Sequence, residues 1–579
     1  MRFDRDPLTR LLARGWPSYV LVTLLQMKVL WLIWRFRDLT TGDTSSYFNI
    51  AYLWYERLGV KIAWSPLYTA FYGSVFALTR DAYLATTLHR VIIVVAATLG
   101  VLALMRRLLP PGLALAIAAW WAIMPINFNT LYEVHLFSLL PVLLAWLVAA
   151  RFDSPAGRGA VLAILLAASV LVRNELVVAS VLFAAACVVL EALDLRRIPG
   201  GRAAGAGRKL VAYVAPLCVA LAICAFFYSR SIVRGPELQR AAQRKHGLNM
   251  CQVYAFGYAQ RHPTWTASPW TECQDLAEAT FGKAMPSLAE MIAANPRAVL
   301  EHFLWNLSLT PAGLQLGLFN VTWGGATPDY VPVEFPYRVM AVIFSLTAGV
   351  VVIAGIVTAR RDWRFRWARW FGERRGVWLA MLAVACVSVP VVLTQRPRPS
   401  YLFAVTVILM AVIGSAVHVL TCRWALWRDR AAVTACLLAL ILAPPYFVTA
   451  KSERPLDDAY QVLRPLAATL ANTKGKVVLG DYAYELPRYV QLKGVATVES
   501  YSALQPRTPS QSVADFFDEQ DIDAVFVQPR ILTELRQMPG AGALLSHPES
   551  LGWRAVTTTR RKRTWILLYR TRFQTAFRP

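Results

Sequence analysis

Long apolar runs separated by short polar segments fill most of the chain. Several of these runs approach the roughly 20 residues that an α-helix needs to cross the hydrocarbon core of a bilayer. We predict about eleven transmembrane helices, over residues 17–34, 88–106, 112–126, 131–150, 160–173, 176–194, 210–229, 338–359, 376–394, 400–420 and 431–449. The pattern therefore predicts a polytopic α-helical membrane protein whose transmembrane domain covers residues 1–449.

The polar segment after the first run, residues 35–87, contains an amphipathic stretch over 44–58. On a helix with this periodicity, one face carries Tyr47, Ala51, Trp54 and Leu58, and the polar face carries Ser45, Asn49, Tyr52 and Glu56. Trp and Tyr favour the bilayer interface. A second helix is expected to begin at Ser65, because Ser is a good N-cap and the Pro that follows is a good first helical residue. We therefore predict two interfacial helices in this first outer loop.

The segment after the last apolar run, residues 450–579, has a different pattern. Four runs resemble β-strands, "GKVVLG", "VATVES", "IDAVFVQ" and "TWILLYR", and helix-like runs such as "SVADFFDEQ" separate them. No Gly-rich phosphate loop follows any of these strands, so a Rossmann-type nucleotide site is not expected. The pattern predicts a soluble α/β domain on the extracytoplasmic side.

A second long polar segment, residues 230–337, is a large outer loop in this topology. Cys251 and Cys273 lie in it, whereas the other six of the eight cysteines sit in or beside apolar runs. If this loop lies outside the cytosol, a disulfide can persist there. We hypothesise a bridge between Cys251 and Cys273.

The net charge of +25 raises the alternative of a nucleic-acid-binding protein. However, the Arg-rich segments at 196–209 and 360–375 lie between apolar runs, and further Arg residues precede the first run. This is the positive-inside pattern of cytoplasmic loops. We therefore expect no nucleic-acid partner, a cytoplasmic N-terminus and, from the Ala- and Arg-rich composition, a multi-pass protein of a bacterial cytoplasmic (inner) membrane.

Acidic residues gather on the outer side of the predicted membrane part. Asp43 lies in "GDTSSYF" just after the first run, Glu133 and His135 lie in "LYEVHLF", and Glu175 follows the fifth span. Ionisable groups in or near a membrane are costly and are candidates for function. The alternative for Asp43 is a plain helix cap, because a carboxylate at a helix N-terminus is stabilised by the helix dipole.

Arginines on the same side break the positive-inside rule. The clearest are Arg396 and Arg398 in "TQRPRPSYLF", and Arg173 precedes Glu175 in "LVRNEL". A guanidinium binds a phosphate with two parallel hydrogen bonds, although an Arg at a membrane interface can also simply extend its charged end to water. Carboxylates and arginines on one membrane face suit a substrate with a phosphate and a hydroxyl to activate, such as a lipid-linked phosphosugar.

The order of these motifs resembles that of the GT-C class of membrane glycosyltransferases, which includes protein O-mannosyltransferases and the aminoarabinose transferase acting on lipid A. The resemblance covers roughly residues 1–450. Asp43 matches the expected catalytic acid after the first helix, "WSPLY" (64–68) with Tyr68 is similar to a Pro-Leu-Tyr stretch in the same loop, and Glu133 resembles the acid of the second outer loop. "RPRPSYLF" with Tyr401 looks like an Arg-Tyr-Leu stretch before a late helix.

The chain also departs from the class. The first loop has a lone Asp where many members have an acidic pair, the second loop has Glu-Val-His where an Asp-x-Asp-like motif is expected, and the segment 230–337 matches no known pattern. The first two departures put metal dependence in doubt.

The resemblance implies inverting transfer of a sugar from a polyprenyl-phosphate donor to a hydroxyl of an envelope glycan, lipid or protein. Asp43 would be the general base, and Glu133 would orient the acceptor or share a cation with it. Substrate-binding roles are expected for Arg173, Glu175, Arg396, Arg398, Tyr401, Tyr68 and His135. No cofactor is assigned with certainty, and a divalent cation (Mg or Mn) bound by Asp43 and Glu133 is an open alternative.

Three other functions stay open from the sequence. A lipid-linked oligosaccharide ligase or polymerase has a similar topology, but catalytic Arg and His residues are expected there in a large late loop. A lipid or solute transporter usually carries charges near the bilayer midplane, whereas here they lie at the outer edge. A noncatalytic envelope scaffold would use the C-terminal segment as a binding module.

Overall fold

The computed structural model describes residues 14–31, 33, 42–125, 133–196, 206–328, 337–361, 374–423, 476–479, 497–500, 510–527, 529–560 and 563–571. The chain divides into two compact units, one made of 1–31, 61–68 and 91–449, and the other of 32–60, 69–90 and 450–579. The predicted boundary between a transmembrane domain 1–449 and a C-terminal domain 450–579 stays a prediction.

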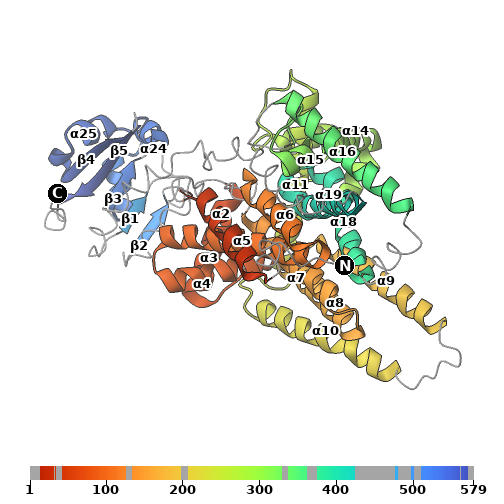
Figure 1. The fold of residues 1–579 in the computed structure, drawn as a ribbon. Helices are drawn as coiled ribbons and strands as arrows, with labels where there is room; N and C mark the ends of the chain where they lie inside the picture. The colour runs from red at the N-terminus through yellow and green to blue at the C-terminus, as the bar shows by residue number, and fades with distance from the viewer. Residues whose placement is uncertain are drawn as a thin grey trace. The chain divides into compact units, whose positions relative to one another are not determined.

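Helices make up almost all of the described membrane part (Figure 1). Seven of them are long and apolar enough to cross a bilayer: α5 (Ala82–Leu108), α7 (Glu133–Arg151), α9 (Leu176–Arg196), α10 (Ala206–Ser229), α16 (Arg338–Arg361), α18 (Arg375–Gln395) and α19 (Phe403–Arg423). Shorter helices are α2 (Trp16–Val29), α6 (Pro111–Ile123) and α8 (Pro155–Leu171). The chain is a multi-pass α-helical membrane protein, as predicted, and the predicted span 431–449 lies outside the described residues.

Small residues allow the helices to pack closely. A Cβ added at Gly159 of α8 would meet the backbone at Tyr213 of α10 at 2.8 Å, and Figure 1 shows these two helices side by side. A Cβ at Gly355 of α16 would meet the Cβ of Ala416 on α19 at 2.6 Å. Small residues at these positions let the helix backbones approach each other, as in other membrane bundles.

Basic residues gather at one end of the bundle. The Arg374 Nε donates to the carbonyl of Arg107 at 3.2 Å, which joins the start of α18 to the end of α5. The Arg375 guanidinium forms an ion pair at 3.2 Å with Asp153, which lies in the turn between α7 and α8. A further ion network at this end consists of Arg158, Asp153, Glu191 and Lys209. The start of α7, the turn between α8 and α9, and the end of α18 therefore belong to the opposite end.

Within its described residues, the predicted large outer loop contains five helices on the side opposite the basic end. They are α11 (Pro236–Arg261), α12 (Cys273–Phe281), α13 (Leu288–Ala294), α14 (Pro296–Ser308) and α15 (Thr310–Phe319). Cys251 and Cys273 form a disulfide that ties α11 to α12, with Cα atoms 5.5 Å apart. Tyr254, Phe281 and Val299 belong to the small core of this loop.

Two helices occupy the first predicted outer loop, α3 (Gly42–Arg57) and α4 (Pro66–Thr79). The aromatic side chains of Phe48, Tyr72 and Phe76 pack together between them, with ring centroids 4.7–6.0 Å apart. Tyr52, expected on the polar face of α3, is buried, and Leu58, expected on its apolar face, is 45% exposed. The apolar face is therefore rotated from the one that the sequence pattern predicts.

The C-terminal segment contains a five-stranded mixed sheet in the order β2-β1-β3-β5-β4. The strands are β1 (Lys476–Leu479), β2 (Thr497–Ser500), β3 (Ile522–Val527), β4 (Trp553–Arg560) and β5 (Arg563–Arg570), and the helices include α23 (Val513–Glu519), α24 (Pro529–Leu535) and α25 (Ala541–Ser546). β1, β2 and β3 are parallel, whereas β5 runs antiparallel to β3 and to β4. Figure 1 shows α24 and α25 beside the sheet.

Candidate functional site

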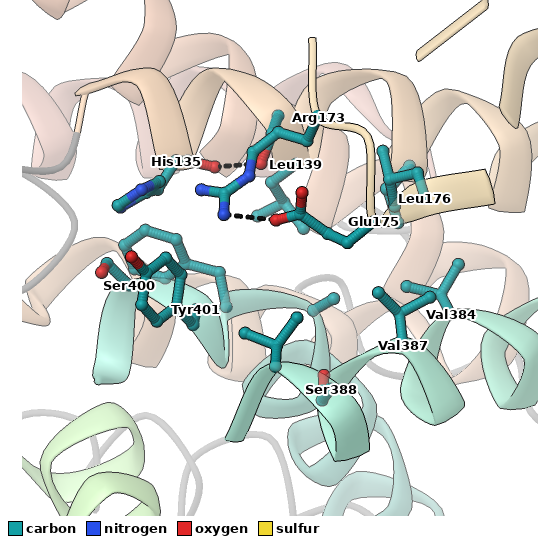
Figure 2. A pocket seen from close by; sticks show the side chains of 15 residues that line it. His135, Leu139, Arg173, Glu175, Leu176, Val384, Val387, Ser388, Ser400 and Tyr401 are labelled. Atoms are coloured by element: carbon teal, nitrogen blue, oxygen red, sulfur yellow. Dashed lines mark hydrogen bonds and ion pairs between the residues drawn. The ribbon is translucent and has the colours of Figure 1, made fainter. Parts of the chain in front are cut away.

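A pocket opens where several helices end on the side opposite the basic residues (Figure 2). Its walls come from the start of α7, the turn between α8 and α9, the end of α18, the 3₁₀ turn Pro399–Tyr401 and the start of α19. The cavity has a volume of about 60 Å³. This is room for several water molecules or a small charged group.

The ring of Tyr401 lies at the centre of the polar part of this pocket. The Arg173 guanidinium lies 5.1 Å from its centroid, and the Arg398 guanidinium lies 5.4 Å from it. The imidazole of His135 packs against the same ring at 4.8 Å between centroids. Two cations and an imidazole from three separate segments are therefore held by one aromatic side chain.

The turn between α8 and α9 holds Arg173 in position. α8 ends at Leu171 and α9 begins at Leu176, and the amide of Arg173 still donates to the carbonyl of Ala168 at 2.9 Å. The Arg173 guanidinium forms an ion pair with Glu175, which Figure 2 shows beside the pocket. Since a guanidinium carries five N–H donors, Arg173 can hold both Glu175 and an oxyanion.

The pocket changes from polar to apolar along the spanning helices. On α7 the lining continues from His135 through Ser138 and Leu139 to Val142, and these four residues lie on one helical face. On α18 it continues from Val391 back to Val384. Each stretch spans eight residues, and its two ends are about 10 Å apart along the helix axis. The pocket therefore has a cationic opening and an apolar floor that extends toward the middle of the bundle.

Arg396 lies in a different environment from Arg398, although both were expected to bind substrate. It is fully buried, and its Nη2 donates to the Oε1 of Gln260 at 3.0 Å and to the carbonyl of Thr327 at 2.7 Å. Its guanidinium also lies 5.6 Å from the ring of Phe256. The structure thus places Arg396 against the large loop and outside the lining of the pocket.

A buried histidine lies next to this contact. His302 of α14 is 1% exposed, and its Nε2 lies 3.3 Å from the carbonyl of Thr394 at the end of α18. Burial lowers the pKa of His302 to about 4. Its neighbour Asn306 donates to the carbonyl of Leu393 at 2.8 Å. This pair joins the large loop to α18, and burial keeps His302 neutral at physiological pH.

Tyr68, also expected at the site, packs with Phe137 of α7 at 5.4 Å between ring centroids and does not line the pocket. Ser65 was expected to be the N-cap of α4. It directly precedes Pro66, the first residue of α4, and has a left-handed backbone with φ 49°. Its hydroxyl donates to the carbonyl of Val172 at 2.7 Å. Ser65 therefore supports the turn that carries Arg173.

The pocket is also lined by three serines that were not predicted from the sequence: Ser138, Ser388 and Ser400. The hydroxyl of Ser400 is buried and has no hydrogen-bond partner among the described residues. Both Ser138 and Ser400 could have been found, because Ser138 lies one helical turn after His135 and Ser400 directly precedes Tyr401.

Of Asp43 and Glu133 the structure describes the backbone and not the side chain. Asp43 is the second residue of α3, and Glu133 is the first residue of α7, two residues before His135. Within the described part of the chain, no group of three or more His, Cys, Asp or Glu side chains could hold a metal ion. The roles of Asp43 and Glu133, and a cation between them, stay predictions.

No protein-family model and no curated protein matches the chain. Among solved structures, it is similar to the archaeal oligosaccharyltransferase AglB from Archaeoglobus fulgidus in complex with an inhibitory peptide and a dolichol-phosphate, with a TM-score of 0.37 and 13% identity over 96% of this chain and 74% of that one. It is also similar to ArnT from Cupriavidus metallidurans bound to undecaprenyl phosphate, with a TM-score of 0.34 and 14% identity over 96% and 98% of the two chains. The TM-scores and the identities are low, so these similarities carry no argument about function. The function of this chain is therefore argued from its own residues.

Proposed function

We propose that this chain is a membrane glycosyltransferase that transfers a sugar from a polyprenyl-phosphate donor to a hydroxyl of an envelope acceptor. The observation that carries the proposal is the pocket between α7 and α18, with Arg173 at its opening and valines on its floor. A phosphate on an isoprenoid chain has the same order of polar and apolar parts. A transporter with its charges at the bilayer midplane would not need this arrangement.

The cationic opening is suited to the phosphate. Arg173 lines the pocket, and the Arg398 guanidinium lies 5.4 Å from the centroid of the Tyr401 ring, which also lines it. Charge-assisted hydrogen bonds from a guanidinium to a phosphate are short and strong, and they strengthen as the phosphate gains charge when it leaves the sugar. Ser400 places a further hydroxyl beside them.

The distribution of charge supports an outer location for the pocket. The bundle end that contains Arg107, Arg374 and Arg375 is the cytoplasmic end by the positive-inside rule. The pocket lies at the opposite ends of α7 and α18. The donor would therefore enter from the outer leaflet.

The proposed chemistry is a single displacement with inversion. Asp43 accepts the proton of the acceptor hydroxyl, whose oxygen forms a bond to the anomeric carbon. The bond between that carbon and the phosphate oxygen breaks, and the polyprenyl phosphate leaves with the electron pair. Arg173 and Arg398 stabilise the charge that develops on this leaving group.

The test is an assay of purified protein in nanodiscs with a panel of polyprenyl-phosphate sugars and candidate acceptors. The variants are Asp43→Asn and, as a matched control, Asp81→Asn, which removes the carboxylate near the start of another helix. We expect the wild type and the control to consume one donor, and Asp43→Asn to be folded and inactive. Equal activity of all three would make Asp43 a helix cap only, and a wild type that consumes no donor would overturn the proposal.

A further inference from the structure

Helix α14 of the large loop has an exposed apolar face. Leu300, Leu304 and Leu307 are 56%, 56% and 53% exposed, and their spacing of four and three residues places them on one side of the helix. The opposite side is buried and contains His302 and Asn306. α14 is not one of the helices long and apolar enough to span a membrane. Exposure of three neighbouring leucines to water costs free energy, so this face is expected to have an apolar partner.

Polar residues border this face on one side. Arg297 and Glu301 form an exposed ion pair at 3.1 Å, one turn apart on α14. On a helical wheel they lie beside the leucines, and Phe303 lies on the other side. An apolar face with a charged border is typical of a helix that lies in the plane of a bilayer surface, with its charged side chains reaching the headgroups.

The contacts of the buried side place α14 at the end of a spanning helix. His302 and Asn306 are one turn apart, yet they contact the carbonyls of two consecutive residues, Thr394 and Leu393, in the last turn of α18. If α14 and α18 ran parallel to each other, residues four apart on α14 would contact residues about four apart on α18. The pattern is therefore that of a helix that crosses the end of α18.

The surface that α18 offers to lipid continues close to this crossing. Val389 of α18 is 60% exposed and lies six residues before the helix ends, which is about 9 Å along the axis. A helix that crosses α18 at its end is therefore expected near the boundary between headgroups and acyl chains.

We propose that the face formed by Leu300, Leu304 and Leu307 inserts into the outer leaflet of the bilayer. It would hold the large loop at the membrane surface, beside the turn that carries Arg396 and Arg398. Trp305 of the same helix donates to Gln260 at 3.0 Å, and Gln260 also accepts from Arg396, so Gln260 links the inserted helix to this turn. This insertion requires the membrane-spanning bundle and does not depend on glycosyl transfer.

The test measures lipid contact at a single labelled position. Leu304→Cys carries an NBD fluorophore in a background that keeps the Cys251–Cys273 disulfide. The cysteines replaced by Ser are Cys187, Cys218, Cys224, Cys386, Cys422 and Cys436. The matched control is Glu278→Cys, an exposed position on α12. Both proteins are placed in phosphatidylcholine nanodiscs with and without nitroxide-labelled lipid.

We expect nitroxide lipid to quench the label at 304 by about two-fold or more, since an inserted apolar face lies about 5–10 Å into the leaflet. Aqueous iodide should quench only the label at 278. Equal quenching by iodide at both positions would overturn the proposal, and so would a label at 304 that neither quencher reaches, because a protein surface would then cover it.

A second measurement keeps all native cysteines. A photoreactive benzoylphenylalanine at position 304 should form lipid adducts on illumination in the nanodisc, visible by intact mass, whereas the same residue at 278 should form none. Absence of a lipid adduct at 304 would count against membrane insertion.

Discussion

Replacement of Arg396 by Met separates a structural role from a substrate-binding one. The Arg396 side chain donates two hydrogen bonds, to the Gln260 side chain at 3.0 Å and to the Thr327 carbonyl at 2.7 Å. Hydrogen bonds of a charged group contribute about 1.5–3 kcal/mol each, so the pair contributes about 3–6 kcal/mol. Met fills a similar volume without a charge, and the loss is therefore mainly that of these two bonds.

Hydrogen–deuterium exchange measures this loss where it occurs. Since every 1.4 kcal/mol is tenfold in an equilibrium constant, we expect amides of α11 to exchange about 100-fold or more faster in Arg396→Met. The matched control is Arg297→Met, which removes an exposed ion pair with Glu301 worth about 0.2–1 kcal/mol. Exchange in the control should change by less than about tenfold.

The opposite result would refute this reasoning. If Arg396→Met exchanges like the wild type and yet loses affinity for a polyprenyl phosphate, Arg396 binds substrate and its contacts with the large loop are incidental.

Three further predictions concern the large loop and the turn beside the pocket. The pKa of His302 in the folded protein is about 4, below its ordinary value of 6.5, so the unfolded chain takes up a proton first as the pH falls. The contribution of neutral His302 to stability is therefore complete above pH 6.5 and is lost as the pH falls toward 4. His302→Gln should flatten this pH dependence of the thermal midpoint. Reduction of the Cys251–Cys273 bridge, which closes a separation of 22 residues, should lower the stability of the loop by about 3 kcal/mol, and alkylation with mass analysis should detect two new thiols there only after reductant; two free thiols without reductant would contradict the disulfide. Gly313→Ala of α15 should shift the turn 396–398 and lower donor affinity, because its Cβ would collide with the Pro397 carbonyl, whereas Gly349→Ala of α16, where no atom lies within 4 Å, should leave affinity unchanged; equal affinities would show that this contact does not support the pocket.

The helices were predictable from the sequence because apolar runs have to satisfy their backbone groups internally in lipid. Most predicted spans match described helices within several residues, including α16 and α18. The strand β4 was missed because its sequence "WRAVTTTR" contains few apolar residues. It lies at the edge of the sheet, where the structure buries Trp553 and leaves Ala555 and Val556 exposed. β-branched Thr residues were the signal that could have indicated it.

The different positions of Arg396 and Arg398 were not predictable from their spacing. Arg396 has a φ of 100°, an unusual backbone conformation outside glycine, and this sends its side chain toward α11 while Arg398 reaches Tyr401. The large loop decides this geometry, because Gln260 and Thr327 supply the acceptors, and both are more than 60 residues away in sequence. By contrast, Arg173 and Glu175 could be paired from the sequence, since they lie in one short turn.

The most direct test of the proposed donor site is the affinity of the purified protein in nanodiscs for undecaprenyl phosphate. Wild type is compared with Arg173→Gln and with Arg244→Gln, which alters an exposed arginine of α11. We predict that Arg173→Gln binds about 10- to 100-fold more weakly, as expected for loss of one charge-assisted contact, and that Arg244→Gln binds like the wild type. Equal affinity of Arg173→Gln and the wild type, or no binding by the wild type, would contradict a lipid-phosphate site in this pocket.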